Sequence, residues 1–268
     1  MEARLRPQKL PQVNEPAPAT ERCDLADGVV ALAPGVAFLP ASAALVVADA
    51  HLGYEDVVGG ALPLWSTAEI VATLLIVVAR TRAREIVFLG DIVHGARMSA
   101  GAMREVAGSL DLLRDVARVT LVAGNHEGRT RAFRVLGATV EEAERDGWLL
   151  VHGDRAARLE HRALIGHLHP SLHLGGGATV PAFVACERLV VVPALTPYSP
   201  GLDLFSPDFA TAVGAWAVDR RHLHVVAATA ERLYPFGALT ALRGAMHAKT
   251  AAASTRGRPF VRRHLRGD

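Results

Sequence analysis

Hydrophobic and polar positions follow two patterns along the chain, the first of them between residues 28 and 136. Short β-branched runs alternate there with longer stretches whose apolar residues recur at helical spacing, as at Met103, Val106, Leu110 and Leu113. The strands predicted from this pattern are two in Gly28–Pro40, around a Pro-Gly turn, and one each in Ala44–Ala48, Glu85–Leu89 and Val119–Ala123. The helices predicted are Thr67–Arg80, with Ser66 as its N-cap, Ser99–Ala117 and Arg129–Leu136.

The second pattern begins at Trp148 and consists of strands separated by short connections. The predicted strands are Trp148–Val151, Ala163–Ile165, Ser171–Leu174, Val180–Ala185, Leu189–Val192, Thr211–Val218 and Leu223–Ala228. A hairpin turn is expected at Gly175–Gly177, which lies between two strands and not before a helix. Strand–helix alternation followed by such a meander predicts an α/β (α+β) fold, in which two sheets pack face to face with helices outside.

Both ends of the chain are expected to lie outside this folded domain. Residues 1–25 are polar and punctuated by proline, which predicts a disordered arm before a folded domain at residues 26–241. Residues 242–268 show little apolar patterning and predict a basic, disordered tail. No secretory signal is recognisable, and the most apolar run is about half as long as a bilayer span. A cytoplasmic protein without a membrane partner is therefore expected.

Composition narrows the class of protein. Hydrophobic residues make up 50% of the chain and charged residues 21%, which excludes disorder for the bulk of it and permits a sizeable core. Cys23 and Cys186 are the only cysteines, too few for a disulfide framework or a cysteine-rich zinc module.

The formal net charge of +2 is the sum of two regions with opposite charge. Residues 243–268 hold seven basic residues against one acidic residue, and residues 1–242 hold 22 basic against 26 acidic, so a body of −4 carries a tail of +6. Arginine-rich segments bind phosphate backbones non-specifically, so the tail predicts a nucleic-acid contact. A solvated, dispensable terminus is the equally weighted alternative.

Chemistry-bearing residues gather where the predicted strands end. The motifs are Asp49-Ala50-His51, Gly90-Asp91 followed by His94, Gly124-Asn125-His126-Glu127, His152-Gly153-Asp154 and Gly166-His167-Leu168-His169. The carboxyl ends of strands are where α/β folds place their ligand-binding groups. Glycines before Asp91, Asn125 and His167 allow the chain to turn sharply there.

These motifs supply carboxylates, imidazoles and one amide, without a thiolate, which favours divalent Mn, Fe, Zn or Mg. The seven candidate ligands are Asp49, His51, Asp91, Asn125, His152, His167 and His169. Seven is too many for one ion that keeps an open position, whereas two ions that share one carboxylate would each have four. The sequence therefore predicts two divalent ions, with manganese expected first. Two-metal sites stabilise both the attacking and the leaving oxygen of a phosphoryl displacement.

The order D-x-H, G-D-x-x-H, G-N-H-E, H-G-D and G-H-x-H resembles that of the calcineurin-like metallophosphoesterases. The resemblance covers about Ala44 to Ile165 and His169, and it implies a four-layer αββα sandwich. It also implies that Asp49, His51 and His169 hold one ion, that Asn125, His152 and His167 hold the other, and that Asp91 bridges them. In the same way it implies that His126 stabilises or protonates the leaving group and that a hydroxide bridging the ions is the nucleophile.

Leu164–Gly175 (LIGHLHPSLHLG) further resembles the small bacterial branch that includes ligase-associated DNA-repair phosphodiesterases and endonucleases. The function expected is hydrolysis of a phosphodiester, which this branch implies to be DNA. The alternatives are a nucleotide pyrophosphatase, a phosphomonoesterase of small molecules, and a scaffold of this fold without catalysis.

Several residues near the motifs keep a plainer interpretation. His94 is expected to orient Asp91 rather than to bind metal, and Asp154 either orients His152 or caps a turn. Tyr198, in the proline-rich loop Pro193–Pro200, can stack on a base or a sugar, although a structural tyrosine is the commoner case.

Overall fold

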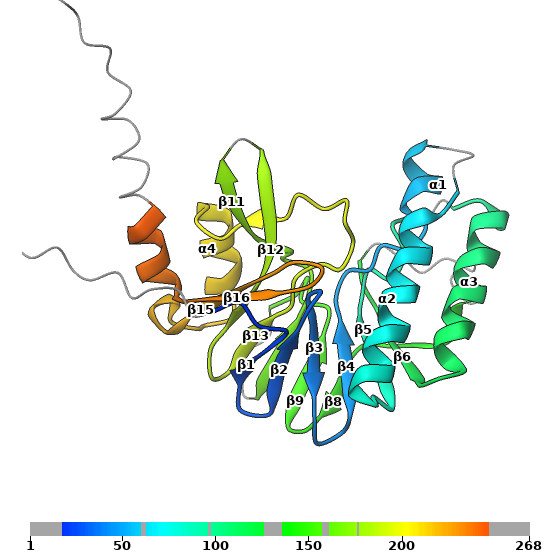
Figure 1. Ribbon diagram of the computed structural model, residues 1–268, viewed down its shortest axis with the longest axis horizontal. Helices are drawn as coiled ribbons and strands as arrows, with labels where there is room; N and C mark the ends of the chain where they lie inside the picture. Colours follow the sequence, from blue (N-terminus) through cyan, green and yellow to red (C-terminus); the bar gives the residue numbers. More distant parts are fainter. Residues whose placement is uncertain are drawn as a thin grey trace, which may run out of the picture.

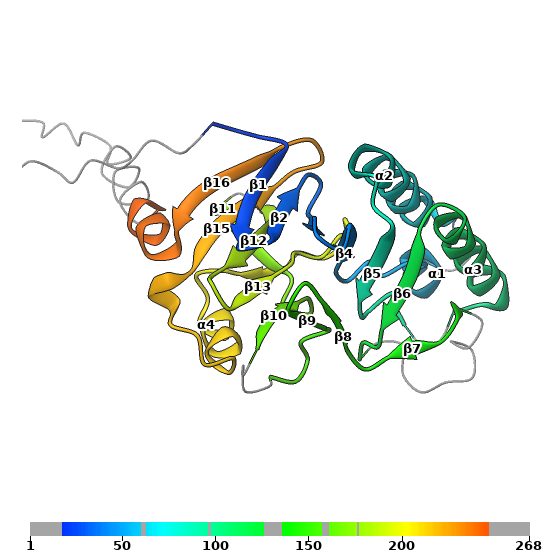
Figure 2. The ribbon, with the colours of Figure 1, turned by 90° about the horizontal axis from the view of Figure 1, so that it is seen from below.

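The computed structural model describes residues 18–59, 63–95, 98–125, 136–156, 161–175 and 177–246. They form two mixed β-sheets that pack face to face, with helices on both outer faces (Figures 1 and 2). The α+β fold with two sheets is therefore confirmed. The described helices include none with the length and hydropathy that a transmembrane span requires.

The first sheet has seven strands in the order in which they occur along the chain. These are β1 (Arg22–Ala26), β2 (Val29–Leu32), β3 (Val36–Leu39), β4 (Ala44–Val47), β5 (Glu85–Leu89), β6 (Arg118–Val122) and β7 (Thr139–Val140). Strands β1 to β4 pair antiparallel, and β4 to β7 pair parallel. The parallel half buries both of its faces, which is why β4 and β5 are apolar at nearly every position.

The second sheet has nine strands, all of them formed from residue 143 onward. Its main path is β14 (Leu202–Asp203), β11 (Pro170–Gly175), β12 (Ala178–Ala185), β13 (Leu189–Val191), β10 (Arg162–Ile165), β9 (Trp148–Val151) and β8 (Ala143–Arg145), with β15 (His224–Ala228) and β16 (Leu233–Ala238) attached to β12. Strands β9, β10 and β13 are parallel, so this part of the sheet is not the meander that the sequence predicts. The expected hairpin joins β11 to β12.

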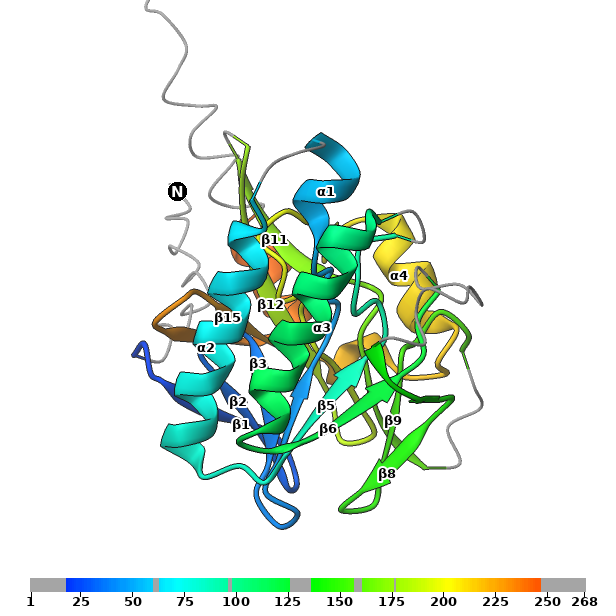
Figure 3. The same cartoon turned by 90° about the vertical axis from the view of Figure 1, so that its right-hand side faces the viewer.

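Three hydrophobic clusters correspond to the three contacts between four layers. Helices α2 (Trp65–Thr81) and α3 (Ala100–Arg114) cover the outer face of the first sheet, as Figure 3 shows. The central cluster joins the two sheets through residues such as Phe183 and Trp148. On the outer face of the second sheet lies α4 (Pro207–Gly214). The short α1 (Tyr54–Gly59) and the 3₁₀ helix η2 (Arg220–His222) complete the named elements.

One predicted strand is wrong. Most of Thr211–Val218 belongs to α4 and the turn that follows it, because Ser206 caps the helix by accepting from the amide of Phe209 and Pro207 occupies its first position. Phe209 and Val213 lie on one face of α4, Trp216 follows in the turn, and all three are buried. The spacing of these three residues is the helical signal that the apolar composition of the segment concealed.

The start of α2 also differs from its expected form. Ser66 does not cap this helix, which begins at Trp65 after Leu64 and has no side-chain cap. Instead the amide and hydroxyl of Ser66 donate to the buried carboxylate of Glu55, at 2.7 and 3.0 Å. A side chain from α1 thus satisfies an amide that a local cap would otherwise serve.

Ordered structure extends beyond the expected folded range at both ends. Strand β1 begins at Arg22, within the expected arm, because it pairs with β2, and Thr20 forms a bridge with Leu233. At the other end residues 239–246 are helical. Leu242 packs against the outer cluster of the second sheet, and Arg243 donates to the carbonyl of Phe205 at 2.6 Å. Long-range contacts therefore order segments that their own composition does not.

An ion pair ties the first sheet to the second. Glu85, on β5, accepts two hydrogen bonds from Arg145, on β8, at 2.7 and 2.8 Å, and a third from Thr120 at 2.7 Å. The hydrogen bonds from Arg145 hold the pKa of Glu85 below its ordinary value, although burial opposes the charge. The stabilisation is therefore complete above the ordinary glutamate pKa and is lost as the pH falls through the lowered one.

Replacing this buried carboxylate should lower stability in a pH-dependent way. Glu85→Gln is expected to cost about 1.5–3 kcal/mol of unfolding free energy at pH 7, because hydrogen bonds to a charged group are lost. The difference from the unmodified protein should shrink as the pH falls below about 4.5. Urea unfolding at several pH values measures both, with Glu144→Gln, an exposed neighbour on β8, as the control. A penalty that does not change with pH would contradict the role of the ion pair.

Candidate metal centre

The five motifs follow the carboxyl ends of parallel strands in both sheets. Asp49 and His51 follow β4, Asp91 follows β5, and Asn125 follows β6. From the second sheet, His152 follows β9, and His167 and His169 follow β10. Isolated bridges between Leu52 and Val93, and between Ala48 and Ala194, extend the pairing past the strand ends. All seven side chains therefore project from one edge of the sandwich.

Six of the seven side chains form two groups that each combine donors from both sheets. In the first, Asp49 and His51 of the first sheet meet His169 of the second. In the second, Asp91 meets His152 and His167. Within each group the candidate ligand atoms lie within 4.8 Å of one another. Either group could hold a metal ion, so the arrangement is consistent with a dinuclear site.

Asn125 belongs to the second group by contact. Its Oδ1 lies 2.8 Å from Nε2 of His152, and Nδ1 of His167 lies 3.1 Å from the same nitrogen. Oδ2 of Asp91 is 3.5 Å away. Three further candidate ligand atoms, from Asn125, His167 and Asp91, therefore surround Nε2 of His152.

The tautomer of His152 explains why this arrangement suits a cation. Nδ1 of His152 lies 2.8 Å from the carbonyl oxygen of Leu89, which can only accept, so this nitrogen carries a proton. In the neutral ring Nε2 then has a lone pair, and it faces the oxygens of Asn125 and Asp91. Lone pairs that converge on one point repel one another, and a bound cation reverses this repulsion.

The buried carboxylate of Asp49 gives a second indication. Asp49 is fully buried, and its Oδ2 accepts the backbone amide of His167 at 2.8 Å. Its Oδ1 has no hydrogen-bond partner, although Nε2 of His169 lies 3.3 Å away. An unsatisfied buried carboxylate oxygen is costly, and a metal ion satisfies it. The donor set thus fits divalent cations.

Backbone strain is concentrated at the same residues. Asp49, His51, Asp91, His167 and His169 all have positive φ angles, between 42° and 62°. This left-handed conformation costs residues other than glycine about 1 kcal/mol or more each, and such strain typically accumulates at functional sites. The strained positions coincide with five of the seven predicted ligands.

Two glycines leave the space that these side chains need. Gly90 has a φ of +73°, and a Cβ there would lie 2.5 Å from Nδ1 of His152. At Gly166 the φ angle is ordinary, but a Cβ would lie 2.6 Å from Oδ2 of Asp49. Gly90 therefore permits both the sharp turn of the backbone and the close approach of His152. Gly166 permits the close approach of Asp49.

The two histidines that follow β10 have opposite pKa shifts. Burial and the neighbouring His152 hold the pKa of His167 below its ordinary value, which favours the neutral ring that a metal ligand requires. Burial acts on His169 in the same sense, but the nearby carboxylate of Asp49 outweighs it and raises the pKa of His169. Nδ1 of His169 also lies 2.6 Å from Oγ of Ser199.

The remaining predicted residues lie around the two groups or outside the described range. Nδ1 of His94 is 3.3 Å from Nδ1 of His51, a candidate ligand of the first group. Asp154 is exposed and pairs with Arg155 at 3.6 Å. His126 and the predicted helix Arg129–Leu136, up to residue 135, lie outside the described residues.

Sequence reasoning missed two residues that support the cluster. Ser199 touches His169, and Glu55 joins the start of α2 to the hydroxyl of Tyr198, 3.3 Å away. Neither belongs to a motif, since both act through contacts between segments far apart in the chain. A proline-rich loop next to a strand end was the only signal at Ser199.

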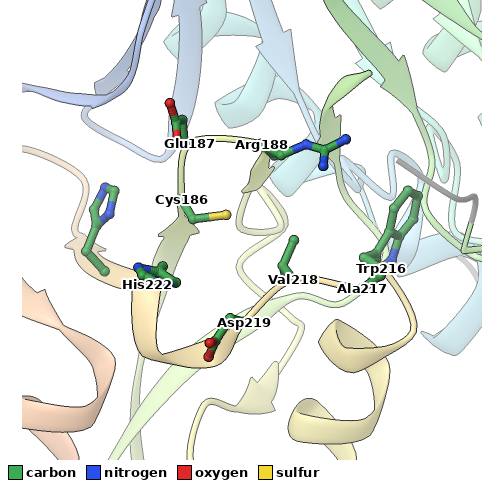
Figure 4. A pocket seen from close by; sticks show the side chains of 9 residues that line it. Cys186, Glu187, Arg188, Trp216, Ala217, Val218, Asp219 and His222 are labelled. Carbon is green, nitrogen blue, oxygen red and sulfur yellow. The ribbon is translucent and has the colours of Figure 1, made fainter. Parts of the chain in front are cut away.

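A cavity of about 570 Å³ opens at the other end of the second sheet (Figure 4). Cys186, Glu187 and Arg188 of the β12–β13 turn line it together with Trp216 and His222. Strand β13 runs from this turn toward the candidate metal centre, so the cavity and the centre lie at opposite ends of it. Among the described residues, the cavity contributes no member to either donor group.

Comparison with known proteins gives one informative likeness. No family model and no curated protein matches the sequence. Among solved structures, the nuclease MPE of Pseudomonas putida matches with a TM-score of 0.59 and 25% identity, over 81% of this chain and 98% of that one. Yfce, a phosphoesterase from E. coli, matches with a TM-score of 0.36 and 16% identity, over 61% and 82% of the respective chains, and adds no argument. The fold, the paired donor groups and the first likeness indicate a phosphoric ester hydrolase with a metallophosphoesterase-like fold.

Proposed function

We propose that this chain is a dinuclear metal-dependent phosphodiesterase that acts on nucleic acid. The observation that carries the proposal is the convergence of seven donors from two sheets on one edge, with a buried oxygen of Asp49 left unsatisfied. The likeness to a nuclease and the resemblance of Leu164–Gly175 to DNA-repair phosphodiesterases favour a nucleic-acid diester, and DNA in particular.

The proposed ligands are those of the two groups. One ion would be held by Asp49, His51 and His169, the other by Asn125, His152 and His167, with Asp91 shared between them. Carboxylates, imidazoles and an amide suit manganese, with iron, zinc or magnesium as alternatives. Bound divalent ions lower the pKa of water and neutralise phosphate oxygens.

The protein's own residues have separate proposed tasks. The carbonyl of Leu89 holds His152 in one tautomer, so that Nε2 stays available to a ligand. Ser199 and Asp49 orient His169 from its two sides. His126, which follows Asn125 directly, is proposed to donate a proton to the leaving group, a role that suits an imidazole near neutral pH.

A substrate comparison tests the reaction class. With Mn²⁺ present, the purified protein is expected to hydrolyse a bis-aryl phosphate faster than the corresponding mono-aryl ester. A chelator should abolish this activity, and added Mn²⁺ should restore it. Preference for the monoester, or for a nucleotide pyrophosphate, would overturn the diesterase assignment. Absence of both bound metal and turnover would favour an inactive scaffold.

The basic tail is proposed to contact the nucleic-acid backbone. Six basic residues follow Met246, namely Lys249, Arg256, Arg258, Arg262, Arg263 and Arg266. A chain that ends at Met246 keeps the helical residues 239–246 and is expected to bind oligonucleotides more weakly and with less salt dependence. Hydrolysis of the bis-aryl phosphate should be unchanged. Equal oligonucleotide affinity at every salt concentration would refute a role for the tail.

A further inference from the structure

A row of aromatic rings leads from the candidate metal centre to an exposed tyrosine. The ring of His51 lies 5.1 Å from that of His94, which lies 4.4 Å from the ring of Tyr54. Tyr54 in turn stacks on Tyr198, with ring centroids 4.3 Å apart and an angle of 18° between the planes. The row thus begins at a candidate ligand and ends at a ring that is 42% exposed.

Tyr198 is held in place from three sides. Its ring lies against Tyr54, and its hydroxyl contacts Oε1 of the buried Glu55 at 3.3 Å. The next residue, Ser199, contacts His169 of the first donor group. Burial opposes the charge of Glu55, but hydrogen bonds from Ser66 and Tyr198 hold its pKa below the ordinary value. The carboxylate is therefore charged at neutral pH and fixes the orientation of the phenol ring.

Tyr198 combines a fixed orientation with an exposed ring. Its ring is held by Tyr54 and Glu55, yet Tyr198 is among the exposed large hydrophobic residues. A second exposed ring, that of Trp65, begins α2 beside Ser66, which shares the carboxylate of Glu55 with Tyr198. Rigid, exposed aromatic rings next to a phosphate-binding centre are the feature with which proteins stack the bases of single strands.

The geometry points to Tyr198, supported by Tyr54 and Glu55, as a stacking platform for a nucleobase that flanks the reacting phosphate of a single-stranded nucleic acid. This inference rests on the proposed nuclease function and adds the form of the substrate to it. In a duplex both faces of a base are covered by the neighbouring base pairs, so a single strand or a frayed end is the substrate. Stacking is tolerant of sequence, because every base has an aromatic face.

The test compares Tyr198→Ala and Tyr198→Phe on three substrates in the presence of Mn²⁺. The substrates are a single-stranded oligonucleotide, the same oligonucleotide with abasic nucleotides beside the cleaved bond, and a bis-aryl phosphate. Tyr198→Ala is expected to raise KM for the intact oligonucleotide at least about 5-fold, which is the lower end of the stacking energy of one base. It should leave KM for the other two substrates within about twofold. Tyr198→Phe keeps the ring and should retain most of the affinity.

A matched control and a binding measurement separate stacking from support of the loop. Tyr234→Ala removes a tyrosine of similar exposure, 40%, on β16 and should change nothing. In an Asp91→Asn background, which is expected to bind without cutting, an oligonucleotide that carries 2-aminopurine should lose fluorescence on binding only when Tyr198 is present. Metal content should be equal in all Tyr198 variants.

Each remaining outcome decides against part of the proposal. Equal loss on all three substrates, together with reduced metal content, would make Tyr198 a support for the loop that holds Ser199 and would overturn the platform. An unchanged KM for the oligonucleotide in Tyr198→Ala would overturn it as well. Ring-dependent fluorescence loss in the Asp91→Asn background, together with no cleavage of oligonucleotides by the protein that keeps Asp91, would overturn the nuclease function alone. Hydrolysis of the bis-aryl phosphate without any binding of oligonucleotides would overturn both.

Discussion

Replacing Asp91 by asparagine is expected to lower the turnover of phosphodiesters by at least about 10³-fold, the equivalent of roughly 4 kcal/mol in activation free energy. Asp91 is 2% exposed, follows the central strand β5 and is adjacent to donors of the second group. Asparagine preserves the shape but removes the negative charge that a shared ligand needs between two cations. We therefore expect bound manganese, measured by atomic emission, to fall from two ions per chain to one or none.

The folding of this variant provides the decisive control. Without metal, Asp91→Asn should unfold at the same temperature as the unmodified protein, or higher, because a strained and buried carboxylate has lost its charge. With Mn²⁺ present, the unmodified protein should gain stability that the variant does not gain. Asp111→Asn, which changes an exposed carboxylate on α3, should leave turnover and metal content unaltered. Full activity in Asp91→Asn would remove Asp91 from the proposed centre.

Adding one methyl group at Gly90 is expected to have the second largest effect. In Gly90→Ala the new Cβ would lie 2.5 Å from Nδ1 of His152 and 2.8 Å from Cα of Gly124, at a φ angle of +73°. Strain and overpacking together should cost about 2–5 kcal/mol of unfolding free energy. Displacement of His152 should also break its hydrogen bond to Leu89 and weaken metal binding.

Gly108 offers a matched substitution with the opposite expectation. It lies in α3, and a Cβ there would meet nothing within 4 Å. Gly108→Ala should therefore stabilise the protein by about 0.5–1 kcal/mol, because alanine restricts the unfolded chain and favours the helix. Urea unfolding and metal titration of both variants compare the two positions. Equal stability of the Gly90 and Gly108 variants would show that the neighbourhood of Gly90 is not tightly packed.

The central strands and helices were predictable because their signals are local. Glu85–Leu89 and Trp148–Val151 are strands with the bounds that the sequence predicts, since each is a compact apolar run between polar turns. Helix α3 begins one residue after the expected start, Ser99, whose side chain caps the helix by accepting the amide of Ala102. In these segments local preference and tertiary packing favour the same structure.

The sequence predictions differ from the structure where contacts between distant segments decide the structure, or where apolar composition conceals a helical signal. Strand β1 has two charged residues among five, and it is ordered by pairing with β2 and by burial of Leu25 between the sheets. At the start of α2, the carboxylate of Glu55 takes the place of a local cap. In α4, a run of apolar and β-branched residues resembles a strand, whereas Ser206 caps a helix there and Pro207 occupies its first position.

The sequence by itself determined which donors this protein offers and that they follow strands, because residue type and strand propensity are properties of short segments. Only the tertiary structure decided how the donors divide, since each group takes residues from both sheets, and the packing of one sheet on the other brings Asp49 to His169 and Asp91 to His152. The same packing buries Asp49 and leaves its Oδ1 without a hydrogen-bond partner. It also sets Tyr198 against Tyr54, a contact between residues 144 positions apart that no local pattern encodes.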